Sequence, residues 1–317
     1  MAAVRYHVRH DTRYHYDQMV GESHHLLRLT PRNLPWQRVL GHHLAIRPEP
    51  AKQRDFVDSF GNQITAVQFT TDHDSLEVIS EFWVAVDACP PVSERAADLP
   101  WETVRDSLRY RADRRFPEDH LKATAFRFAS PSVPIDSRYA DYARQVFTEG
   151  QPLVPAVIAL MALIHRDFVF DPTATDTFTP VNQAFEQRRG VCQDFTHIMI
   201  ACLRSIGLAA RYMSGYILTH PPKGKPRLVG ADATHAWVSV FVPGYGWLEL
   251  DPTNNVLAQR EHIVLGWGRD FSDVTPLRGV LLGGGDHEPE IAVTVVPQHD
   301  FASLYAEGGT YLEEVPE

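Results

Sequence analysis

The amino-acid sequence predicts an α+β protein in which an all-β region precedes a core that packs one helix against an antiparallel sheet. Up to about residue 92, short runs rich in β-branched and aromatic residues alternate with turn residues, and no strong helical pattern interrupts them. From residue 154 onward, apolar residues recur at helical spacing instead. The last of these helices is followed by three predicted strands, and this order predicts the helix-on-sheet core.

The front region, residues 1–92, is expected to form a sandwich-like all-β domain. Residues 4–10 alternate crudely, and better strands are predicted at 44–46, 64–69 and 76–84. The run from Asp58 to Asn62 has turn-forming residues and separates two of these strands. Two consecutive prolines at positions 90 and 91 end the pattern and predict a semi-rigid link to a connecting segment with short helices, residues 93–150.

The second domain is expected to cover residues 151–285. Its first helix buries one face, which is formed by Val157, Leu160, Met161 and Ile164. A second helix begins at Cys192 and ends at Gly207, and its apolar stripe is Phe195, Ile198, Met199, Cys202, Leu203 and Ile206. Strands are predicted at 209–218, 235–242 and 247–251. The C-terminal part, residues 286–317, adds a strand at 291–296 and a tail.

Composition restricts the classes of partner. The chain has 317 residues, of which 44% are hydrophobic and 22% charged, as in an ordinary globular protein. Its net charge of −10 argues against nucleic acid as the main partner, because phosphate binding favours a basic surface. No apolar run has the length of a membrane span, and residues 1–7 lack the apolar segment of a secretory signal. We therefore expect a cytoplasmic protein without a membrane or nucleic-acid partner.

The cysteines and histidines predict neither a disulfide framework nor a metal site. Only three cysteines are present, Cys89, Cys192 and Cys202, and no pair of them has the spacing of a zinc motif. Histidines stand in adjacent pairs at 24–25 and 42–43. Neighbouring residues on a strand point to opposite faces, so neither pair can chelate an ion as a unit. No metal and no cofactor is expected.

Cys192 is the candidate nucleophile. It stands where a turn runs directly into an apolar helical pattern, so that it falls in the first turn of the predicted helix. Helix starts offer unpaired N–H groups and the positive end of the helix dipole, and both favour a thiolate. Taken alone, Cys192 is more often the small buried hydrophobe that most free cysteines are. A nearby imidazole and carboxylate would favour the reactive interpretation.

His235 and Asp251 are the candidates for that imidazole and carboxylate. Antiparallel residues that lie opposite each other point to the same face. The two residues therefore share a face only if the loop between their strands has an odd number of residues. A three- or five-residue turn within the run from Val242 to Gly246 satisfies this condition, and its glycines suit such a loop. Asp251 has the alternative role of forming a turn before Pro252.

Four further residues are expected to bind substrate or to support the site. Trp237 and Trp247 either line the site or simply pack in the core, and the sequence does not decide between these roles. Asp194 lies one helical turn before His197, and we expect it to support the site without taking part in the chemistry. Gln193 follows the candidate nucleophile directly.

Four segments resemble the bacterial transglutaminase-like proteins, which are often described as candidate cysteine proteases. The segments are Gly190-Val191-Cys192-Gln193-Asp194-Phe195-Thr196-His197, Leu208 to Tyr216, Asp232-Ala233-Thr234-His235-Ala236-Trp237 and Asp251-Pro252-Thr253-Asn254. The Asp58 to Asn62 run in front resembles the N-terminal region that accompanies this core. The resemblance implies a papain-like, transglutaminase-like core with Cys192 as nucleophile, His235 as general base and acid, and Asp251 as orienting carboxylate.

The expected activity is thiol-dependent acyl transfer on a peptide, protein or other amide substrate. Hydrolysis is favoured modestly, because nothing in the sequence marks a second site for an amine or the calcium loops of animal cross-linking enzymes. Transfer of the acyl group to an amine is the first alternative. A non-catalytic peptide-binding module is the second, and the complete set of Cys192, His235 and Asp251 argues against it.

Overall fold

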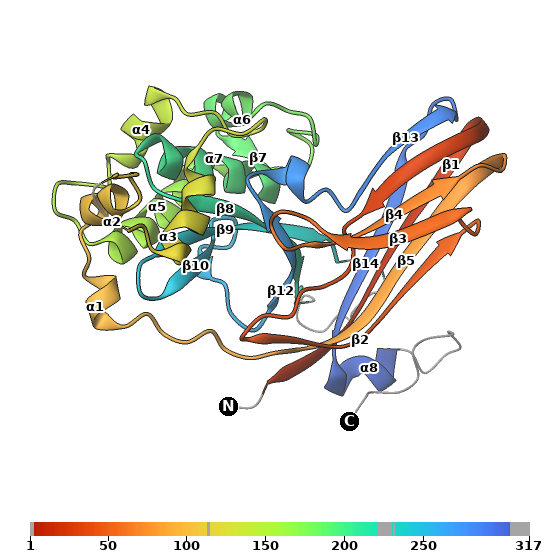
Figure 1. Cartoon of the computed structure of the whole chain (residues 1–317), viewed down its shortest axis with the longest axis horizontal. Helices are drawn as coiled ribbons and strands as arrows, with labels where there is room; N and C mark the ends of the chain where they lie inside the picture. The colour runs from red at the N-terminus through yellow and green to blue at the C-terminus, as the bar shows by residue number, and fades with distance from the viewer. Residues whose placement is uncertain (1–2, 113–114, 221–229, 231, 305–317) are drawn as a thin grey trace.

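The computed structural model describes residues 3–112, 115–220, 230 and 232–304 of the chain. Figure 1 shows two parts side by side, a large antiparallel sheet and a domain of helices around a smaller sheet. The predicted α+β class, with an all-β region before a helix-on-sheet core, is confirmed. No helix in the described residues has the length and apolar character needed to span a bilayer.

The front sheet takes strands from both ends of the chain. Its seven strands are β1 (Val4–Leu27), β2 (Gln37–Arg47), β3 (Lys52–Val57), β4 (Gln63–Phe69), β5 (His73–Val86), β13 (Leu277–Gly283) and β14 (Pro289–Pro297). β13 falls within the range expected for the second domain, yet it pairs with β1. The β14 strand and the following helix α8 (Gln298–Leu304) lie in the C-terminal part, of which residues 305–317 are outside the described residues.

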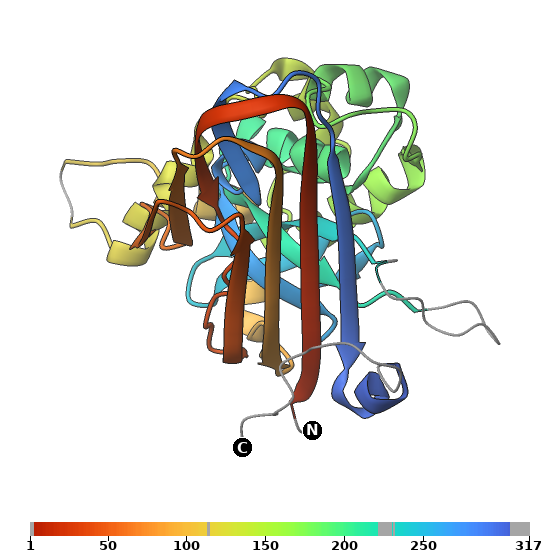
Figure 2. The ribbon, with the colours of Figure 1, turned by 90° about the vertical axis from the view of Figure 1, so that its right-hand side faces the viewer.

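The sheet forms two layers because β1 is long and folds over. The first half of β1 pairs with β5 and β14, and its second half pairs with β4 and β13. The pairing with β5 shifts register between His15 and Val20, where the strand turns over, as Figure 2 shows. Apolar side chains from both layers fill the space between them, including Tyr16, Leu76, Val78, Leu27, Val67 and Phe69. The expected sandwich-like arrangement is thus built from one continuous sheet.

The second domain holds a five-stranded sheet in the order β11-β10-β9-β8-β12. These strands are β8 (Ala210–Ile217), β9 (Thr234–Val242), β10 (Gly246–Asp251), β11 (Val256–Leu257) and β12 (His262–Gly268). The helices and short pairs that precede or surround this sheet are α1 (Glu94–Ala97), α2 (Trp101–Ser107), α3 (Glu118–Thr124), η1 (Ala125–Arg127), α4 (Ser137–Ala143), α5 (Leu153–Asp167), β6 (Val169–Phe170), α6 (Val181–Gln187), β7 (Arg189–Gly190), α7 (Cys192–Ser205) and η2 (Phe271–Asp273).

Helix α7 is the central element of this domain. Its apolar residues pack on one face of the sheet, where Ala236, Val238 and Val240 of β9 are buried against it. The alternate residues of β9 point to the opposite face, because side chains alternate along a strand. Helix α6 ends at Gln187, where Arg188 adopts the left-handed conformation (φ 55°).

The front sheet is bound firmly to the second domain through β12. Gln37 pairs with the backbone of Val264 like a short strand: its Nε2 donates to the carbonyl oxygen at 2.8 Å and its Oε1 accepts from the N–H at 2.7 Å. Asn62, in the predicted turn, bonds both the N–H and the carbonyl of Trp267. A cluster of buried apolar residues continues the contact. The front sheet contributes Tyr6, Val8 and Phe82, and the second domain contributes Tyr216, Ile263 and Leu265.

Candidate active site

Cys192 is the first residue of α7, as the sequence predicts, and its side chain is half-buried. The first N–H groups of a helix have no acceptor within the helix, and the helix dipole places positive charge there. An oxyanion formed next to the sulfur would therefore meet backbone donors, including the N–H of Cys192.

Asp194 shapes the start of this helix. Its Oδ2 accepts a hydrogen bond from the N–H of Val191 at 2.8 Å and from Oγ1 of Thr175 at 2.6 Å. A Cβ atom at Gly190 would collide with this carboxylate, so glycine is needed there for the carboxylate to fold back. Burial raises the pKa of Asp194, and its hydrogen bonds oppose that effect. Asp194 thus supports the helix start, as expected.

The predicted relation between His235 and Asp251 depends on the loop between β9 and β10. Val242 pairs with Gly246, so the loop has three residues, one of the two lengths predicted. Continuing this register by one pair from Val238 and Leu250 places Asp251 opposite Trp237 and diagonal to His235. The His235 ring donates from Nε2 to Oδ2 of Asp251 at 2.7 Å.

Asp251 accepts five hydrogen bonds. Its Oδ2 accepts hydrogen bonds from Nε2 of His235 at 2.7 Å, from Nε2 of His262 at 3.1 Å and from the side-chain amide of Asn254 at 2.7 Å. Its Oδ1 receives the backbone N–H groups of Thr253 at 3.0 Å and Asn254 at 3.2 Å. One oxygen thus holds the histidines while the other forms the turn. The two roles that the sequence left as alternatives are combined in one side chain.

The charges of His235 and Asp251 stabilise each other. Burial would lower the pKa of His235, but its hydrogen bonds with Asp251 and Cys192 outweigh burial and raise the pKa to about 10. Burial would raise the pKa of Asp251, yet the hydrogen bonds from His235 and His262 hold it well below its usual range. Nε2 of His235 is bound to Asp251, so Nδ1 is the ring nitrogen left for the thiol of Cys192. A protonated ring in this position favours a thiolate.

His262 belongs to this site although no local sequence pattern indicates it. It begins β12, which pairs with β8, and two strands, β9 and β8, lie between β12 and β10 in the sheet. Gly215 of β8 lies between, and a Cβ atom there would collide with the carbonyl oxygen of Ile263 and crowd the indole of Trp237. Because Gly215 has no side chain, the rings of Trp237 and His262 meet with their centroids 5.2 Å apart.

Trp237 supports the imidazole from one side. Its indole is fully buried and stacks on the His235 ring, with centroids 6.0 Å apart and planes 22° from parallel. The indole Nε1 donates to Oε2 of the buried Glu249 at 2.7 Å. Glu249 thereby fixes the indole against which His235 rests, and burial raises the pKa of this carboxyl group.

Trp247 lies away from the triad. Its ring stacks on the guanidinium of Arg211, which is 4.2 Å from the ring centroid, and packs against Phe126 and Phe241. Arg211 lies between Trp247 and Trp267, whose ring centroid is 3.9 Å from the same guanidinium. Of the two alternatives left for Trp247, the structure therefore favours packing over lining the site.

Gln193 contacts a loop beside the nucleophile. Its Nε2 donates to the carbonyl oxygen of Thr177 at 3.1 Å. Together with the Thr175–Asp194 bond, this contact fastens the 171–180 loop to the start of α7. Gln193 and Asp194 act on the same loop from consecutive positions of the helix.

The other cysteines and His197 have different surroundings. Cys202 is fully buried on the apolar stripe, and burial raises the pKa of its thiol. Burial also raises the pKa of Cys89, in this case to about 12. His197 is buried, accepts from the N–H of Phe271 at 3.2 Å, and has a pKa lowered to about 4 by burial. It therefore stays neutral at pH 7.

His235, Asp251 and His262 also form a set of three groups that a metal ion could use, because their ligand atoms lie within 4.8 Å of one another. The two imidazole nitrogens lie 2.7 and 3.1 Å from one carboxylate oxygen. Those are hydrogen-bond distances, whereas ligands placed about 2.0–2.2 Å from a tetrahedral zinc lie farther apart from each other. Hydrogen bonding explains the arrangement, and the absence of a metal stays a prediction.

The front sheet also positions the segment that leads into His235. Asp232 forms a bridge with Val293 of β14, and its Oδ2 accepts from the N–H of Val295 at 2.8 Å. The N–H of Gly230 donates to Oγ1 of Thr294 at 2.7 Å. The strand that carries the imidazole is thus anchored to β14, and β12 with His262 is anchored to Gln37 and Asn62.

Comparison with known proteins agrees with this architecture. Residues 6–85 match the bacterial transglutaminase-like N-terminal region, and residues 140–252 match the transglutaminase-like superfamily. An uncharacterised protein of Mycobacterium tuberculosis is 39% identical over 92% of this chain and 93% of its own length. A second uncharacterised protein, from Mycobacterium leprae, is 30% identical over 92% of this chain and 98% of its own.

Two further comparisons reach proteins with a described activity or structure. A protein-glutamine γ-glutamyltransferase of Pseudomonas aeruginosa is 35% identical over 124 residues, which cover 38% of this chain and 18% of that protein. The crystal structure of a candidate cysteine protease from Cytophaga hutchinsonii superposes with a TM-score of 0.71 and 17% identity, covering 94% of this chain and 92% of that one. It shares the fold. The chain therefore belongs to the transglutaminase-like superfamily and carries the bacterial N-terminal region that accompanies its core.

Proposed function

We propose that the protein is a thiol-dependent acyl-transfer enzyme that hydrolyses a peptide or other amide bond through a thioester on Cys192. The observation that carries this proposal is the position of the His235 ring, which is hydrogen bonded to Asp251 at 2.7 Å and in contact with Cys192. A thiol, an imidazole and a carboxylate in this order are the parts of an activated-cysteine site.

In the proposed mechanism, the Cys192 thiolate attacks the carbonyl carbon of the amide. Backbone N–H groups at the start of α7 stabilise the oxyanion of the tetrahedral intermediate. The His235 imidazolium then gives its proton to the leaving amine as the C–N bond breaks, which leaves a thioester. A water molecule attacks the thioester while His235 takes its proton, and the C–S bond then breaks, which releases the acid and restores the thiolate–imidazolium pair.

The residues around the triad support this cycle. Asp251 holds the ring orientation and stabilises the imidazolium, and His262 donates a second ring hydrogen bond to the same oxygen. Trp237, fixed by Glu249, limits rotation of the His235 ring. A peptide or protein amide is the proposed substrate. A cytoplasmic location stays a prediction. The absence of a nucleic-acid partner, of a membrane partner and of a cofactor also stays a prediction.

Transfer of the acyl group to an amine is the second candidate. The local similarity to a protein-glutamine γ-glutamyltransferase favours it. Both reactions share the same thioester, and they differ only in whether water or an amine attacks it. Because both reactions start from the same acyl-enzyme, hydrolysis and amine transfer can be compared directly in one mixture that contains water and an amine.

The experiment incubates the full chain with a library of glutamine-containing peptides and a dansyl-labelled alkylamine. Mass spectrometry then measures hydrolysed peptide, deamidated glutamine and incorporated amine in each reaction. We expect hydrolysis products to exceed amine incorporation, and Cys192→Ala to abolish both. Amine incorporation in excess of hydrolysis would overturn the hydrolase proposal in favour of the transferase. Equal product with Cys192→Ala would refute both.

A further inference from the structure

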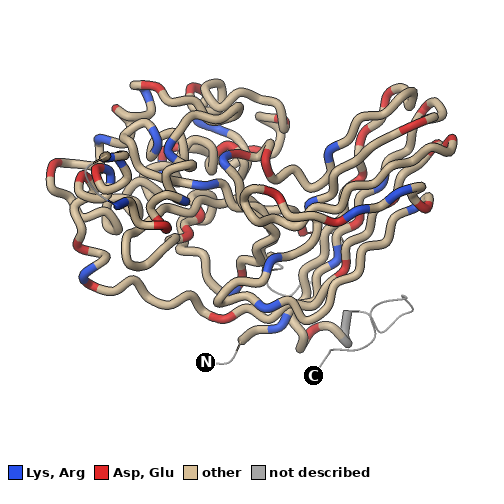
Figure 3. The backbone as a smooth tube through the Cα atoms, viewed as in Figure 1, with Lys and Arg blue, Asp and Glu red and all other residues tan. Residues whose placement is uncertain are grey.

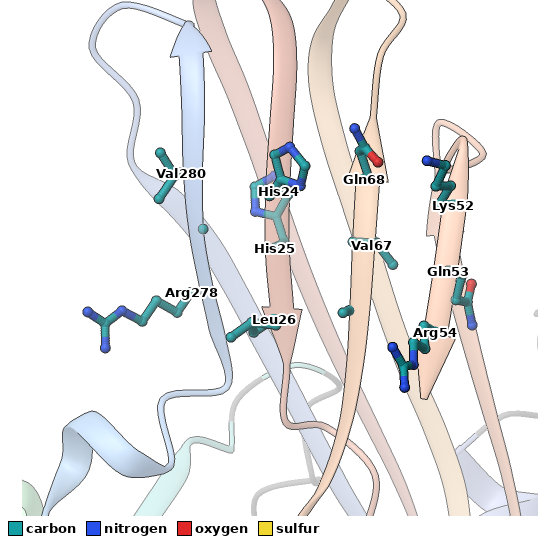
Figure 4. Close-up of a pocket in the computed structure, with 12 residues that line it drawn as sticks. His24, His25, Leu26, Lys52, Gln53, Arg54, Val67, Gln68, Arg278 and Val280 are labelled. Atoms are coloured by element: carbon teal, nitrogen blue, oxygen red, sulfur yellow. The ribbon is translucent and has the colours of Figure 1, made fainter. Parts of the chain in front are cut away.

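The second layer of the front sheet has an outer face that combines cations with exposed apolar side chains. The layer consists of β13, β1, β4 and β3, in that order. Figure 4 looks onto the residues that line a hollow on this layer, whose volume is about 430 Å³. We call the outward residues Leu26, Lys52, Arg54, Arg278, Val280 and Leu282 the basic-apolar face.

Strand register arranges these residues in two rows across the four strands. One row consists of Arg278, Leu26, Ala66 and Arg54. The next row consists of Val280, His24, Gln68 and Lys52. The first row therefore places two apolar side chains between two arginines. The alternate residues His25 and Val67 point inward and are buried.

The apolar members of the face are unusually open to solvent. Val280 is 77% exposed and Leu282 is 72% exposed. Both lie on β13, on the same side as Arg278, since side chains alternate along a strand. Contiguous exposed aliphatic groups are common on surfaces that bind another molecule.

Several arginines of the first layer are held in ion pairs, unlike the cations of this face. In the first layer, Arg13 and Arg47 both pair with Glu77, and Arg9 pairs with Asp11 at 2.8 Å. Within the described part of the chain, Lys52, Arg54 and Arg278 form no ion pair. Figure 3 shows both signs of charge along the front sheet. This face also carries one carboxylate, Glu22, which is opposite Leu282 and bonded to His24 and Gln68, so its three cations leave it net positive in a chain of net charge −10. Its charge complements an acidic ligand.

The spacing of the rows defines the form of that ligand. Arg278 and Arg54 are three strand spacings apart, or about 14 Å. An extended polypeptide covers about 13 Å in four residues, and every second side chain points to the same side. Acidic residues at positions i and i+4 would thus reach the two arginines while residue i+2 lies over Leu26 and Ala66.

We propose that the basic-apolar face binds an extended polypeptide segment of the pattern acidic-x-apolar-x-acidic. The segment crosses the strands, with its two carboxylates on Arg278 and Arg54 and its central apolar side chain in the hollow. Lys52, Val280 and Leu282 extend the contact along the next positions of the sheet. This inference goes beyond the proposed function and does not depend on it.

The test measures fluorescence anisotropy with two labelled peptides of identical composition. The first is Gly-Glu-Thr-Val-Thr-Glu-Gly, which has the proposed spacing, and the second is Gly-Glu-Glu-Val-Thr-Thr-Gly, which does not. We expect the full chain to bind the first peptide at least about fivefold more tightly, with an affinity that falls as salt rises. Equal affinity for the two peptides would overturn the proposed spacing.

Two triple variants with the same change of net charge separate this face from general electrostatics. Lys52→Glu with Arg54→Glu and Arg278→Glu is expected to weaken binding at least about tenfold. Arg95→Glu with Arg144→Glu and Arg166→Glu changes exposed residues of the helical domain and should leave affinity within about twofold. Similar losses in both variants would contradict the proposal. Circular dichroism and the alkylation rate of Cys192 report whether each variant is folded.

Other occupants of the face are distinguished in the same preparation. Sedimentation velocity of the chain alone reports whether the face joins two copies, and a dimer that the first triple variant dissociates would overturn the proposal. Tighter binding of oligo(dT) or of anionic phospholipid vesicles than of the first peptide, lost in the same variant, would overturn it too. A monomer that prefers the spaced peptide is the expected result.

Discussion

The two ends of one face of the five-stranded sheet hold buried charges in different ways. At one end, the Asp251 carboxylate accepts five hydrogen bonds, two of them from histidine rings. At the other end, the Arg211 guanidinium lies between the rings of Trp247 and Trp267, and its Nε has no hydrogen-bond partner in the described structure. The hydrogen bonds to Asp251 fix the orientation of the histidine rings, whereas the rings around Arg211 pack against it without orienting a reactive group.

The two arrangements lead us to expect different effects of substitution on turnover and on folding. Hydrogen bonds to one oxygen orient a ring toward a neighbouring sulfur, so small changes there should alter turnover more than folding. Aromatic rings stacked on a cation bury a large area without orienting any reactive group, so changes there should alter folding more than turnover. Trp237 and Glu249 lie between the two ends and connect them.

The largest effect is expected from the reacting residues. His235→Ala removes the proton donor for the leaving amine and the partner of the thiolate, and we expect kcat to fall by at least about 10³-fold. Turnover of the best library peptide measures this loss. The melting temperature should also fall, because the buried ring is hydrogen bonded to Asp251 and stacked on Trp237, so turnover is compared per folded molecule. Retention of more than a tenth of the activity would contradict the assignment.

Asp251→Asn is expected to lower kcat by roughly 10³- to 10⁴-fold, because an amide neither stabilises the imidazolium nor fixes its tautomer. The Asn side chain can still accept the turn hydrogen bonds through one oxygen. Steady-state kinetics together with thermal denaturation measure this effect. A variant that loses stability but keeps its turnover per folded molecule would show that Asp251 only forms the turn.

Trp247→Ala provides the opposite case. It removes a partly buried ring packed on Arg211, Phe126 and Phe241, and we expect the loss of unfolding free energy to lie somewhat below the roughly 3–5 kcal/mol of a fully buried aromatic ring. Denaturant unfolding measures the loss, and kcat below the melting transition should stay within about threefold, since the ring does not orient a reactive group. A large fall in kcat with unchanged stability would place Trp247 in the site after all.

His262→Phe keeps a ring beside Trp237 but removes the donor to Asp251. A hydrogen bond to a charged group contributes about 1.5–3 kcal/mol, so kcat should fall by about tenfold or somewhat more. His262→Gln, which can still donate, serves as the matched control and should retain more activity. Equal activity of the two variants would show that packing alone matters at this position.

The smallest effect is a pH dependence of stability. The pKa of His235 is raised to about 10, so its stabilising contribution is full below its ordinary value of 6.5 and is lost as pH rises toward 10. We expect the difference in unfolding free energy between the wild type and His235→Gln to shrink across that interval. Denaturant unfolding at several pH values measures it. A difference that grows with pH would contradict the raised pKa.

Sequence reasoning predicted that His235 and Asp251 meet, because the number of residues in the loop decides which strand residues share a face. The three-residue loop after Val242 is one of the two predicted lengths, and it puts His235 and Asp251 on one side. The loop length does not give distance along a strand, however. Trp247 lies on the same face as Asp251, but it is four positions away along the strand, or about 13 Å. Its ring therefore packs away from the His235–Asp251 pair.

The rest of the site depends on pairings between distant segments. His262 reaches Asp251 only because β12 joins the sheet beside β8, a strand order that no local pattern encodes. In the same way, β13 and β14 extend the front sheet because β1 is long enough to offer an edge in each layer. Such contacts arise in tertiary structure, where loop lengths and strand propensities alone do not specify the partner.

The most direct test of the account is the alkylation of the three cysteines by iodoacetamide near pH 6.5, followed residue by residue with mass spectrometry. We predict that Cys192 reacts far faster than Cys89 or the buried Cys202 in the native protein. His235→Ala should reduce the Cys192 rate by at least about a hundredfold and leave the other two unchanged. Equal reactivity of Cys192 and Cys89, or a Cys192 rate unaffected by His235→Ala, would contradict an imidazole-activated nucleophile.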